Sequence, residues 1–274
     1  SGGPYDLPVV DDNGCEDETS ITSDEPPLLE ATIAPPTPID CNNANGSATA
    51  SVSGGTASYS YSWSNGDTGA TISTNISGTY TVTVTDSNGC TDDATVTINE
   101  DLVDPTAVAA SSGIIDCVNT TVGISGSGSS TGSDFIYLWT TSDGTIDSGD
   151  TTLDPVVSSG GTYTLTVTNT ANGCEDMVSV TISEDTTPPV ADAGPGAELT
   201  CAITEVVLLG TNSDVGPDYT YSWTTSGGNI VSGENSLTPI VDEAGTYTIT
   251  VTNIVNGCTE TDQVTITEDI NAPV

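Results

Sequence analysis

The sequence predicts an all-β protein built from several small, similar domains that follow one another along the chain. One hairpin-like segment occurs three times, at residues 78–90, 161–174 and 245–258, and a more divergent copy lies at residues 3–15. In the three clear copies Thr alternates with apolar residues, which is typical of a half-buried strand. Every copy then reaches Asn-Gly, a tight-turn signal, and a Cys.

The spacing of these hairpins indicates a repeat of about 80 residues. Their cysteines, at positions 15, 90, 174 and 258, are 75 or 84 residues apart, and a fixed period predicts an array of similar units. Pro-rich joints such as Asp104-Pro105 and Thr187-Pro188-Pro189 fall between the copies. We therefore predict the hairpin of a preceding repeat at 1–25, complete repeats at 26–101, 102–185 and 186–269, and the start of another repeat at 270–274.

Cysteines are expected to staple each repeat, because a domain of this size buries only a modest core. Cys41, Cys117 and Cys201 each lie 22 residues before a Trp. We predict one intradomain disulfide per repeat, each closing a loop of about 50–60 residues and contributing roughly 3–4 kcal/mol. The predicted pairs are Cys41–Cys90, Cys117–Cys174 and Cys201–Cys258.

Cys15 is left over, and we expect it to pair with a cysteine upstream of residue 1, the alternative being a free thiol. Paired cysteines in small β-domains indicate an oxidising compartment outside the cytosol. Zinc is disfavoured as the role of these cysteines, because the sequence contains no His and no CxxC motif.

The aromatic residues are predicted to pack in the cores, the alternative being a platform for sugars. They recur at constant positions on alternating strands. The set comprises Trp63, Trp139, Trp223, Tyr80, Tyr163 and Tyr247. About seven short strands per repeat and the order Cys…Trp…Cys favour an immunoglobulin-like β-sandwich. The second Cys lies ten or eleven residues after the Tyr, which places it at the end of the hairpin.

The charge balance excludes several classes of function. The chain has 39 acidic residues and no Lys, Arg or His, so nothing can neutralise nucleic-acid phosphates or anionic lipid headgroups. Catalysis that depends on His or Lys is impossible, and the scattered carboxylates give no pocket signal, so we predict no enzyme. No run of 18 apolar residues is present, which argues against membrane insertion.

Two kinds of modification or ligand fit the remaining polar residues, although no cofactor is required. An acidic pair closes every repeat, and with nearby acids it offers oxygen ligands for Ca²⁺ at the joints; the alternative is a solvated polar surface. The candidate ligands are Glu100, Asp101, Asp104, Glu184, Asp185, Asp192, Glu268 and Asp269. Asn45, Asn75 and Asn119 match the N-linked glycosylation pattern. Thr151 and Thr186, which follow Asp150 and Asp185, resemble an O-linked acceptor in which the modified residue follows an Asp.

The motifs resemble a known family of extracellular repeats. Cys41-Asn-Asn-Ala-Asn-Gly-Ser, Tyr59-Ser-Tyr-Ser-Trp63 and Gly78-Thr-Tyr-Thr-Val-Thr-Val-Thr-Asp-Ser-Asn-Gly-Cys90 resemble the SprB-type repeat of gliding-motility adhesins of Bacteroidetes. Residues 102–185 and 186–269 resemble the related PKD-like and immunoglobulin-like repeats. The resemblance implies a secreted cell-surface fibre or adhesin, in which the partners are neighbouring repeats or identical chains, and surface glycans are possible ligands.

Two other functions stay open from the sequence. A polymerising pilin would insert residues 1–25 into the sheet of a neighbouring subunit. A carbohydrate-binding module would instead present an exposed aromatic platform. The first predicts strand pairing between chains, and the second predicts exposed Trp side chains.

Overall fold

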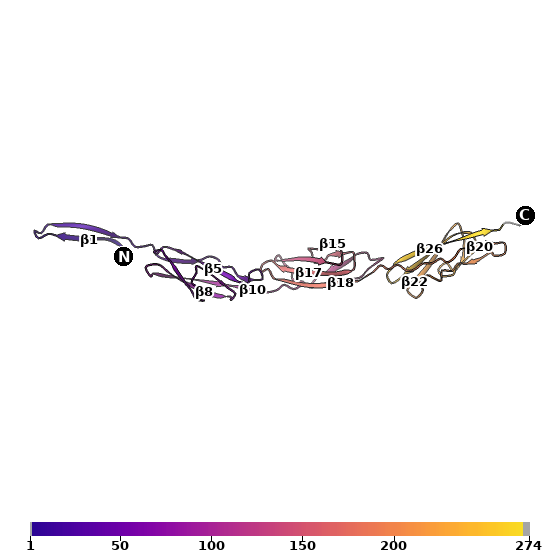
Figure 1. The fold of residues 1–274 in the computed structure, drawn as a ribbon, viewed down its shortest axis with the longest axis horizontal. Coiled ribbons are helices and arrows are strands. Elements are labelled where there is room, and N and C mark those ends of the chain that lie inside the picture. The colour runs from indigo at the N-terminus through magenta and orange to yellow at the C-terminus, as the bar shows by residue number, and fades with distance from the viewer. Residues whose placement is uncertain (1, 271–274) are drawn as a thin grey trace. The chain divides into compact units, whose positions relative to one another are not determined.

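The computed structural model describes residues 2–270, and these residues form strands, turns and connecting loops without a helix (Figure 1). The predicted all-β class is therefore confirmed. No helix in this part of the chain is long and apolar enough to cross a membrane. The repeat predicted to start at 270–274 lies, apart from residue 270, outside the described residues.

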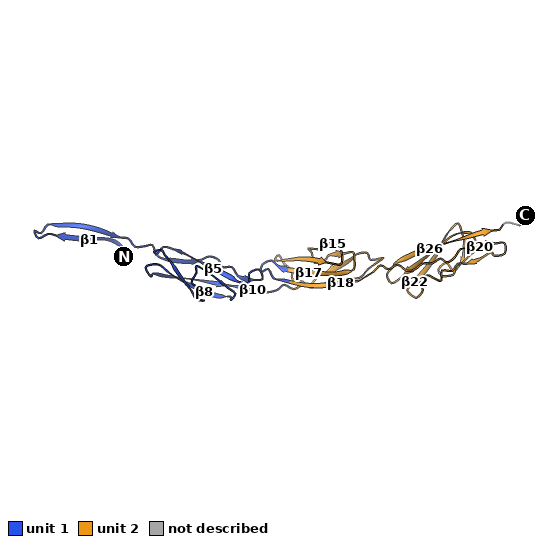
Figure 2. Ribbon diagram, in the orientation of Figure 1, with its two compact units in different colours: residues 1–105, 168–175 blue, residues 106–167, 176–274 orange. Residues whose placement is uncertain are grey.

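The chain forms two compact units, coloured separately in Figure 2. Unit 1 comprises residues 1–105 together with residues 168–175, and unit 2 comprises residues 106–167 and 176–274. Residues 168–175 are the hairpin tip of the second predicted repeat. This tip therefore belongs to the same unit as the first predicted repeat.

Unit 1 begins with an isolated hairpin. Strands β1 (Gly3–Val10) and β2 (Glu16–Ser23) pair antiparallel from Gly3 with Ser23 to Val10 with Glu16. Tyr5, Leu7 and Val9 are 54–61% exposed, whereas the corresponding residues of the next hairpin are buried. Whether this hairpin finishes a preceding repeat stays a prediction.

The rest of unit 1 is a sandwich of two three-stranded sheets, in the orders β3-β5-β7 and β6-β8-β9. The two-residue strands β4 and β10 pair separately, in parallel. The strands are β3 (Glu30–Ile33), β4 (Ile39–Asp40), β5 (Gly46–Ser53), β6 (Ser60–Trp63), β7 (Thr71–Thr74), β8 (Gly78–Thr85), β9 (Thr91–Ile98) and β10 (Glu100–Asp101).

The core of this sandwich follows the alternation of the sequence. Tyr80, Val82 and Val84 of β8 point inward and are at most 8% exposed, while the intervening Thr residues are more exposed. Trp63 is 2% exposed, and its indole N–H donates to the carbonyl of Gly69 at 2.8 Å. Because the buried N–H has an acceptor, the ring can pack in the core at little cost.

Unit 2 contains two further hydrophobic cores, one in residues 107–182 and one in residues 191–266. The first lies between the sheets β11-β13-β16-β15 and β14-β17-β18, and the second between β20-β26-β25-β22 and β21-β24-β23. Trp139 and Trp223 are 2% and 3% exposed. Together with Trp63, they occupy core positions in three separate hydrophobic clusters; the repeat boundaries themselves stay predictions.

The strands of this region have the following bounds; β17 and β18 extend into residues 168–175 of unit 1. They are β11 (Ala110–Ser111), β12 (Ile115–Asp116), β13 (Val122–Ser125), β14 (Phe135–Thr141), β15 (Ile146–Ser148), β16 (Val156–Val157), β17 (Gly161–Asn169), β18 (Glu175–Ile182), β19 (Glu184–Asp185), β20 (Ala197–Thr200), β21 (Val206–Val207), β22 (Tyr219–Ser226), β23 (Ile230–Ser232), β24 (Ile240–Val241), β25 (Gly245–Asn253) and β26 (Thr259–Asp269).

Each core also holds a tyrosine whose hydroxyl is satisfied by local backbone. The hydroxyls of Tyr80, Tyr163 and Tyr247 donate to the carbonyls four residues earlier. This resembles the tyrosine corner of immunoglobulin-like sandwiches. Burial raises the pKa of Tyr247, because the charged phenolate would lose its hydration.

One carboxylate in each repeat ties the first segment of the sandwich to its last strand. These residues accept a backbone N–H from a position 61 or 69 residues earlier, at 2.7–2.8 Å. The pairs are Ala31 with Asp92, Ala107 with Asp176 and Ala193 with Asp262. With no cation in the sequence, backbone N–H groups serve as the partners of these carboxylates.

Candidate functional site, two disulfide joints between successive repeats

The described residues contain two disulfides, and both connect successive predicted repeats. Cys41 bonds to Cys174 and Cys117 bonds to Cys258, each with a Cα–Cα distance of 5.0 Å. The predicted intradomain pairs Cys41–Cys90, Cys117–Cys174 and Cys201–Cys258 are therefore wrong. Cys15, Cys90 and Cys201 are free and exposed in this chain, and an upstream partner for Cys15 stays a prediction.

The length of the final hairpin explains why the intradomain pairs cannot form. Cys41 directly follows β4, which pairs with β10 just beyond the Ile98 end of β9. Cys90 lies at the turn between β8 and β9, at the opposite end of both strands. An eight-residue strand spans about 26 Å at about 3.3 Å per residue, far beyond the roughly 7 Å limit for the Cα atoms of a disulfide.

One half of each joint, which we call the socket, is built at the end of a repeat. It consists of the two residues before the first Cys, the parallel-paired acidic strand, and the turn that carries the Cys. The first socket comprises residues 39–43 and the acidic strand 100–101, in which Glu100 and Asp101 pair with Ile39 and Asp40. In the second, residues 115–119, Ile115 and Asp116 pair with Glu184 and Asp185.

An aspartate caps the turn of each socket. Asp40 Oδ1 accepts the backbone N–H groups of Asn42 and Asn43, at 3.0 and 2.7 Å. Asp116 accepts those of Val118 and Asn119 in the same way. The backbone N–H of Asn119, followed by its side-chain amide, holds the pKa of Asp116 below its ordinary value, because these bonds favour the carboxylate.

The other half of each joint, which we call the tip, is the Asn-Gly-Cys hairpin turn of the following repeat. Asn172 in the tip 169–174 is 1% exposed. Its Nδ2 donates to Asp101 Oδ1 and to the Val103 carbonyl, both at 3.0 Å. The backbone carbonyl of Asn172 accepts the N–H of Cys41 at 3.0 Å. Asn172 therefore bonds to both segments of the socket, to Asp101 and Val103 through its side-chain amide and to Cys41 through its backbone carbonyl.

The second joint repeats this arrangement in the tip 253–258. Asn256 is 2% exposed, and its Nδ2 donates to the Thr187 carbonyl at 3.0 Å. The backbone carbonyl of Asn256 accepts the N–H of Cys117 at 3.1 Å. In both tips the Asn Oδ1 also accepts the N–H of the Cys two residues later, at 3.0 Å.

Glycine is required in both tips. Gly173 and Gly257 have φ angles of +72° and +69°, in the left-handed region that favours glycine. A Cβ at Gly173 would lie 2.1 Å from the side chain of Asn42, and one at Gly257 would lie 2.2 Å from Cγ2 of Val118. The tip backbone therefore touches the residue that follows the socket Cys.

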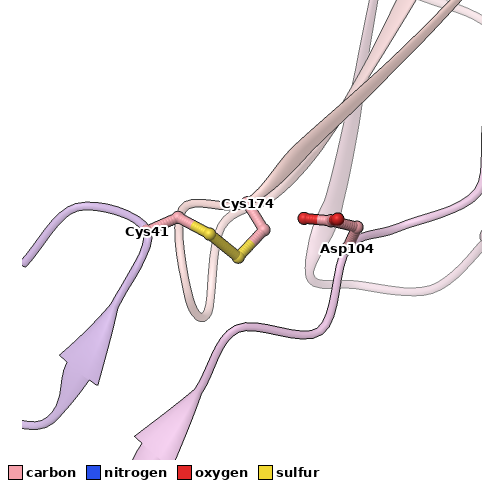
Figure 3. A group of neighbouring side chains, drawn as sticks. All are labelled: Cys41, Asp104 and Cys174. Carbon is pink, nitrogen blue, oxygen red and sulfur yellow. A yellow bond between two sulfur atoms is a disulfide. The ribbon is translucent and has the colours of Figure 1, made fainter. Parts of the chain in front are cut away.

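The first joint also brings a carboxylate to the sulfur atoms. Asp104 lies beside the Cys41–Cys174 disulfide (Figure 3), with one carboxylate oxygen and both sulfurs within 4.8 Å of one another. Within residues 2–270 this is the only such group of three or more His, Cys, Asp or Glu side chains. Its sulfurs are bonded to each other, so they offer no thiolate for a metal.

The candidate calcium ligands are thus not gathered around one point in the part of the chain that the structure describes. Glu100–Asp101 and Glu184–Asp185 form the short strands β10 and β19, and several oxygens of the candidate ligands accept protein hydrogen bonds. Glu100 accepts from Ser77, Glu184 from Gly160, Asp185 from Thr187 and Asp192 from Gly194. Calcium binding at these residues, including Glu268 and Asp269, stays a prediction.

The candidate glycosylation sites all lie on the surface. Asn45, Asn75, Asn119, Thr151 and Thr186 are exposed. Only Asn119 takes part in a joint, since its side-chain amide donates to the carboxylate of Asp116 at 3.1 Å. Their modification stays a prediction.

Sequence reasoning missed the roles of Asn172, Asn256, Asp40 and Asp116. The available signal was the recurrence of Asn-Gly-Cys and of Ile-Asp-Cys, at residues 39–41 and 115–117. By itself an Asn-Gly pair predicts only a tight turn and does not identify a partner for the Asn.

Comparisons with known proteins agree with the predicted resemblance over part of the chain. Residues 33–68 match the family model described as SprB repeat. No curated protein sequence matches the chain.

Several solved structures show similarity to the chain. The three N-terminal domains of the highly immunogenic outer capsid protein (Hoc) of bacteriophage RB49 are 15% identical, covering 88% of this chain and 98% of that one, with a TM-score of 0.34. Sidekick-1 immunoglobulin domains 1–5 are 14% identical, covering 98% and 67%, with a TM-score of 0.32. The PKD domain from KIAA 1837 protein is 23% identical, covering 33% and 97%, with a TM-score of 0.26. Because these TM-scores are below 0.5, our conclusions rest on the residues of the chain itself.

Proposed function

We propose that this chain is a segment of an extracellular surface fibre or adhesin, in which it serves as a shaft of disulfide-joined repeats. The observation that carries this proposal is the placement of both disulfides between successive repeats. The SprB repeat match at residues 33–68 supports an adhesin of the predicted family. Disulfides of this kind persist in oxidising surroundings, which supports a location outside the cytosol.

The joints supply what a shaft needs, because domains joined by short linkers otherwise move freely relative to one another. Each joint combines a disulfide with hydrogen bonds from one buried Asn. The bonds run from socket to tip, so they oppose separation of the two repeats. Joints of this kind would hold successive repeats together under load.

The interleaved order of the bridges also limits how far the chain can be stretched. The bonded cysteines occur in the order Cys41, Cys117, Cys174, Cys258, so the loops closed by the two bridges overlap between residues 117 and 174. With both bridges intact, the shortest covalent path through the chain is about 110 residues, or about 400 Å at roughly 3.5 Å per residue. Without them the path is about 270 residues, or about 950 Å.

Neither rival function gains support from the structure. The three Trp side chains are at most 3% exposed, which leaves no Trp platform for a carbohydrate-binding module. The pilin alternative needs residues 1–25 to insert into another chain, and here β1 and β2 pair with each other. We also propose that the chain has no catalytic role, since no triad that requires His can form.

The pairing on which the proposal depends can be tested by two cleavages without reduction. Cyanogen bromide cuts after Met177, the only methionine, and the Cys117–Cys258 bridge should keep the two fragments joined. Dilute acid cuts the Asp104–Pro105 and Asp154–Pro155 bonds, and all three fragments should stay joined. Release of any fragment before reductant is added would contradict the pairing.

The biological role needs a test on the native particle. Antibody raised against residues 26–269 should label extracellular filaments in electron micrographs of intact cells. Single-molecule stretching should give a contour length of about 400 Å that rises to about 950 Å after reduction. Label found only inside cells, or an unchanged contour length, would refute the shaft.

A further inference from the structure

We infer that residues 199–203 form a third, open socket, which takes the Asn-Gly-Cys tip of a following repeat and bonds it through Cys201. The inference goes beyond the proposed shaft by assigning a site and a partner to a cysteine that is free and exposed in this chain. It rests on a comparison of this segment with the two occupied sockets.

The strand pairing of the open socket matches that of the occupied sockets. Leu199 and Thr200 of β20 pair in parallel with Glu268 and Asp269 of β26. Ile115 and Asp116 pair with Glu184 and Asp185 in the same register. The residue before the Cys therefore faces the second acid of the pair in both.

The turn that carries the cysteine is also already formed. The N–H of Thr200 donates to the Ile203 carbonyl at 2.9 Å, and that of Asp116 donates to the Asn119 carbonyl at 3.0 Å. Thr200 Oγ1 accepts the N–H groups of Ala202 and Ile203, at 3.3 and 3.1 Å. Thr200 thus replaces the capping aspartate of the occupied sockets.

The sulfur of Cys201 has the same neighbour in the open socket as the sulfur of Cys117 has in the second occupied socket. Cys201 Sγ lies 3.6 Å from the Ile270 carbonyl, and Cys117 Sγ lies 4.0 Å from the Thr186 carbonyl. Both carbonyls directly follow the acidic pair of the repeat. Because Cys117 in this position is bonded to Cys258, Cys201 is placed for the same bond.

The partner is a tip of the following repeat in the same chain. In both occupied joints the tip Cys lies downstream, at sequence separations of 133 and 141 residues. A tip tethered in this way reaches a high effective concentration at its socket. Both bonded tips also carry the buried Asn and the positive-φ Gly that the socket contacts.

Formation of the bond requires an oxidant, for which we name a small-molecule disulfide such as oxidised glutathione. The Cys201 thiolate attacks one sulfur of this disulfide and releases one small thiol. The tip thiolate then attacks Cys201 Sγ and releases the second small thiol. Two protein thiols are oxidised and one small disulfide is reduced to two thiols, so the step balances.

The test uses a chain extended by one repeat, in which a second copy of residues 186–269 follows Asp269. The added tip Cys then lies 141 residues after Cys201, the separation of the Cys117–Cys258 pair. After refolding with oxidised glutathione, Cys201 should be joined to the added tip in non-reduced peptide maps. Its labelling by iodoacetamide should fall at least tenfold from that in the 274-residue chain.

Two matched variants keep the test decisive. The Cys258→Ser change made only in the added copy should restore labelling of Cys201, and Cys90→Ser should change nothing. Labelling that persists in the extended chain, or a bond from Cys201 to a second molecule, would overturn the inference. The Cys41–Cys174 and Cys117–Cys258 bonds are read in the same maps, so their presence would show that the shaft proposal survives such a failure.

Discussion

The hairpin tips of this chain are of two kinds, although all end in Asn-Gly-Cys. The tips at residues 169–174 and 253–258 have an Asn at their base and are joined to a socket. The tips at residues 11–15 and 86–90 are one residue shorter, have an Asp at their base, and carry exposed free cysteines.

The difference lies in where the tip directs its hydrogen bonds. Asn172 and Asn256 bond to the socket of the preceding repeat. Asn88 instead donates to Thr56 of its own repeat, and Asp86 accepts the N–H groups of Thr56, Asn88 and Cys90. The short tip therefore makes its hydrogen bonds within its own repeat, whereas the long tip makes them with the preceding repeat. The following predictions compare the two kinds, from the largest expected effect to the smallest.

Removal of a tip cysteine should separate the two kinds most clearly. Cys258→Ser breaks a bridge that closes a span of 141 residues, and we expect a loss of roughly 3–5 kcal/mol, about 10 °C in the calorimetric Tm. Cys90→Ser removes no bond and should leave Tm unchanged. Equal effects from the two variants would show that Cys90 is also bonded.

Replacement of the buried tip Asn by Ala should cause the next largest loss of stability. Asn256→Ala leaves the N–H of Cys258 and the carbonyl of Thr187 without their partner, and should cost about 1–3 kcal/mol. The exposed Asn88→Ala should fall within about 0.5 kcal/mol. Denaturant unfolding of both variants measures this contrast, and a loss at Asn88 as large as that at Asn256 would contradict it.

Alanine at the tip glycine tests the contact with the socket. Gly257→Ala and Gly89→Ala both place a Cβ at positive φ, +69° and +84°, at a cost of about 1–2 kcal/mol each. Only in the Gly257 variant does the added Cβ also clash with Val118, since nothing lies within 4 Å of a Cβ at Gly89. The Gly257 variant should therefore lose more stability.

The double variant Gly257→Ala with Val118→Ala should recover that additional loss. Melting curves of the four proteins form a double-mutant cycle. Additive effects in this cycle would mean that the tip does not press on Val118.

Acid titration should distinguish the second socket through Asp116. The pKa of its carboxyl is lowered from 3.8, so its contribution to stability is present above about pH 3.8 and is lost as pH falls through the folded value. Acidification also relieves the general repulsion of the chain, so the comparison is with Asp116→Asn. The stability difference between the two proteins should shrink below pH 3.8, and a constant difference would argue against this role.

Reduction kinetics should show the smallest difference, between the two joints themselves. Asp104 lies beside Cys41–Cys174, while the equivalent position in the second joint is Pro188. A thiolate attacking the first bridge meets this negative charge, which at about 5 Å in water costs somewhat less than about 1 kcal/mol. The first bridge should be reduced about 2–5-fold more slowly by glutathione at low salt.

Asp104→Asn should remove this difference, and so should high salt, because the carboxylate is exposed and its field is screened. Alkylation of the released thiols followed by peptide mapping gives the rate for each bridge. A difference that persists in the variant would assign the protection to burial.

Much of the fold was accessible from local patterns. The alternation at Tyr80, Val82 and Val84 determined which face of the hairpin is buried, and the constant position of Trp63, Trp139 and Trp223 marked the cores. The SprB resemblance at the first repeat agrees with the match at residues 33–68. These features are local because a strand of period two needs only its own residues to define its faces.

The joints were not accessible in the same way, because they depend on which ends of different repeats meet. The regular spacing of Cys41 and Cys90 is the same whether the bond lies within a repeat or between repeats. The amide of Asn172 likewise has no assigned partner in the sequence, since Asp101 lies 71 residues away.

The sequence by itself determined the all-β repeats, the absence of cationic chemistry and the inventory of cysteines. Only the tertiary structure decided how those cysteines pair. The physical reason is distance: β4 pairs with β10, the strand that ends the repeat, and this pairing holds Cys41 at the opposite end of the sandwich from the hairpin tip that carries Cys90. The nearest Asn-Gly-Cys turn is then that of the next repeat.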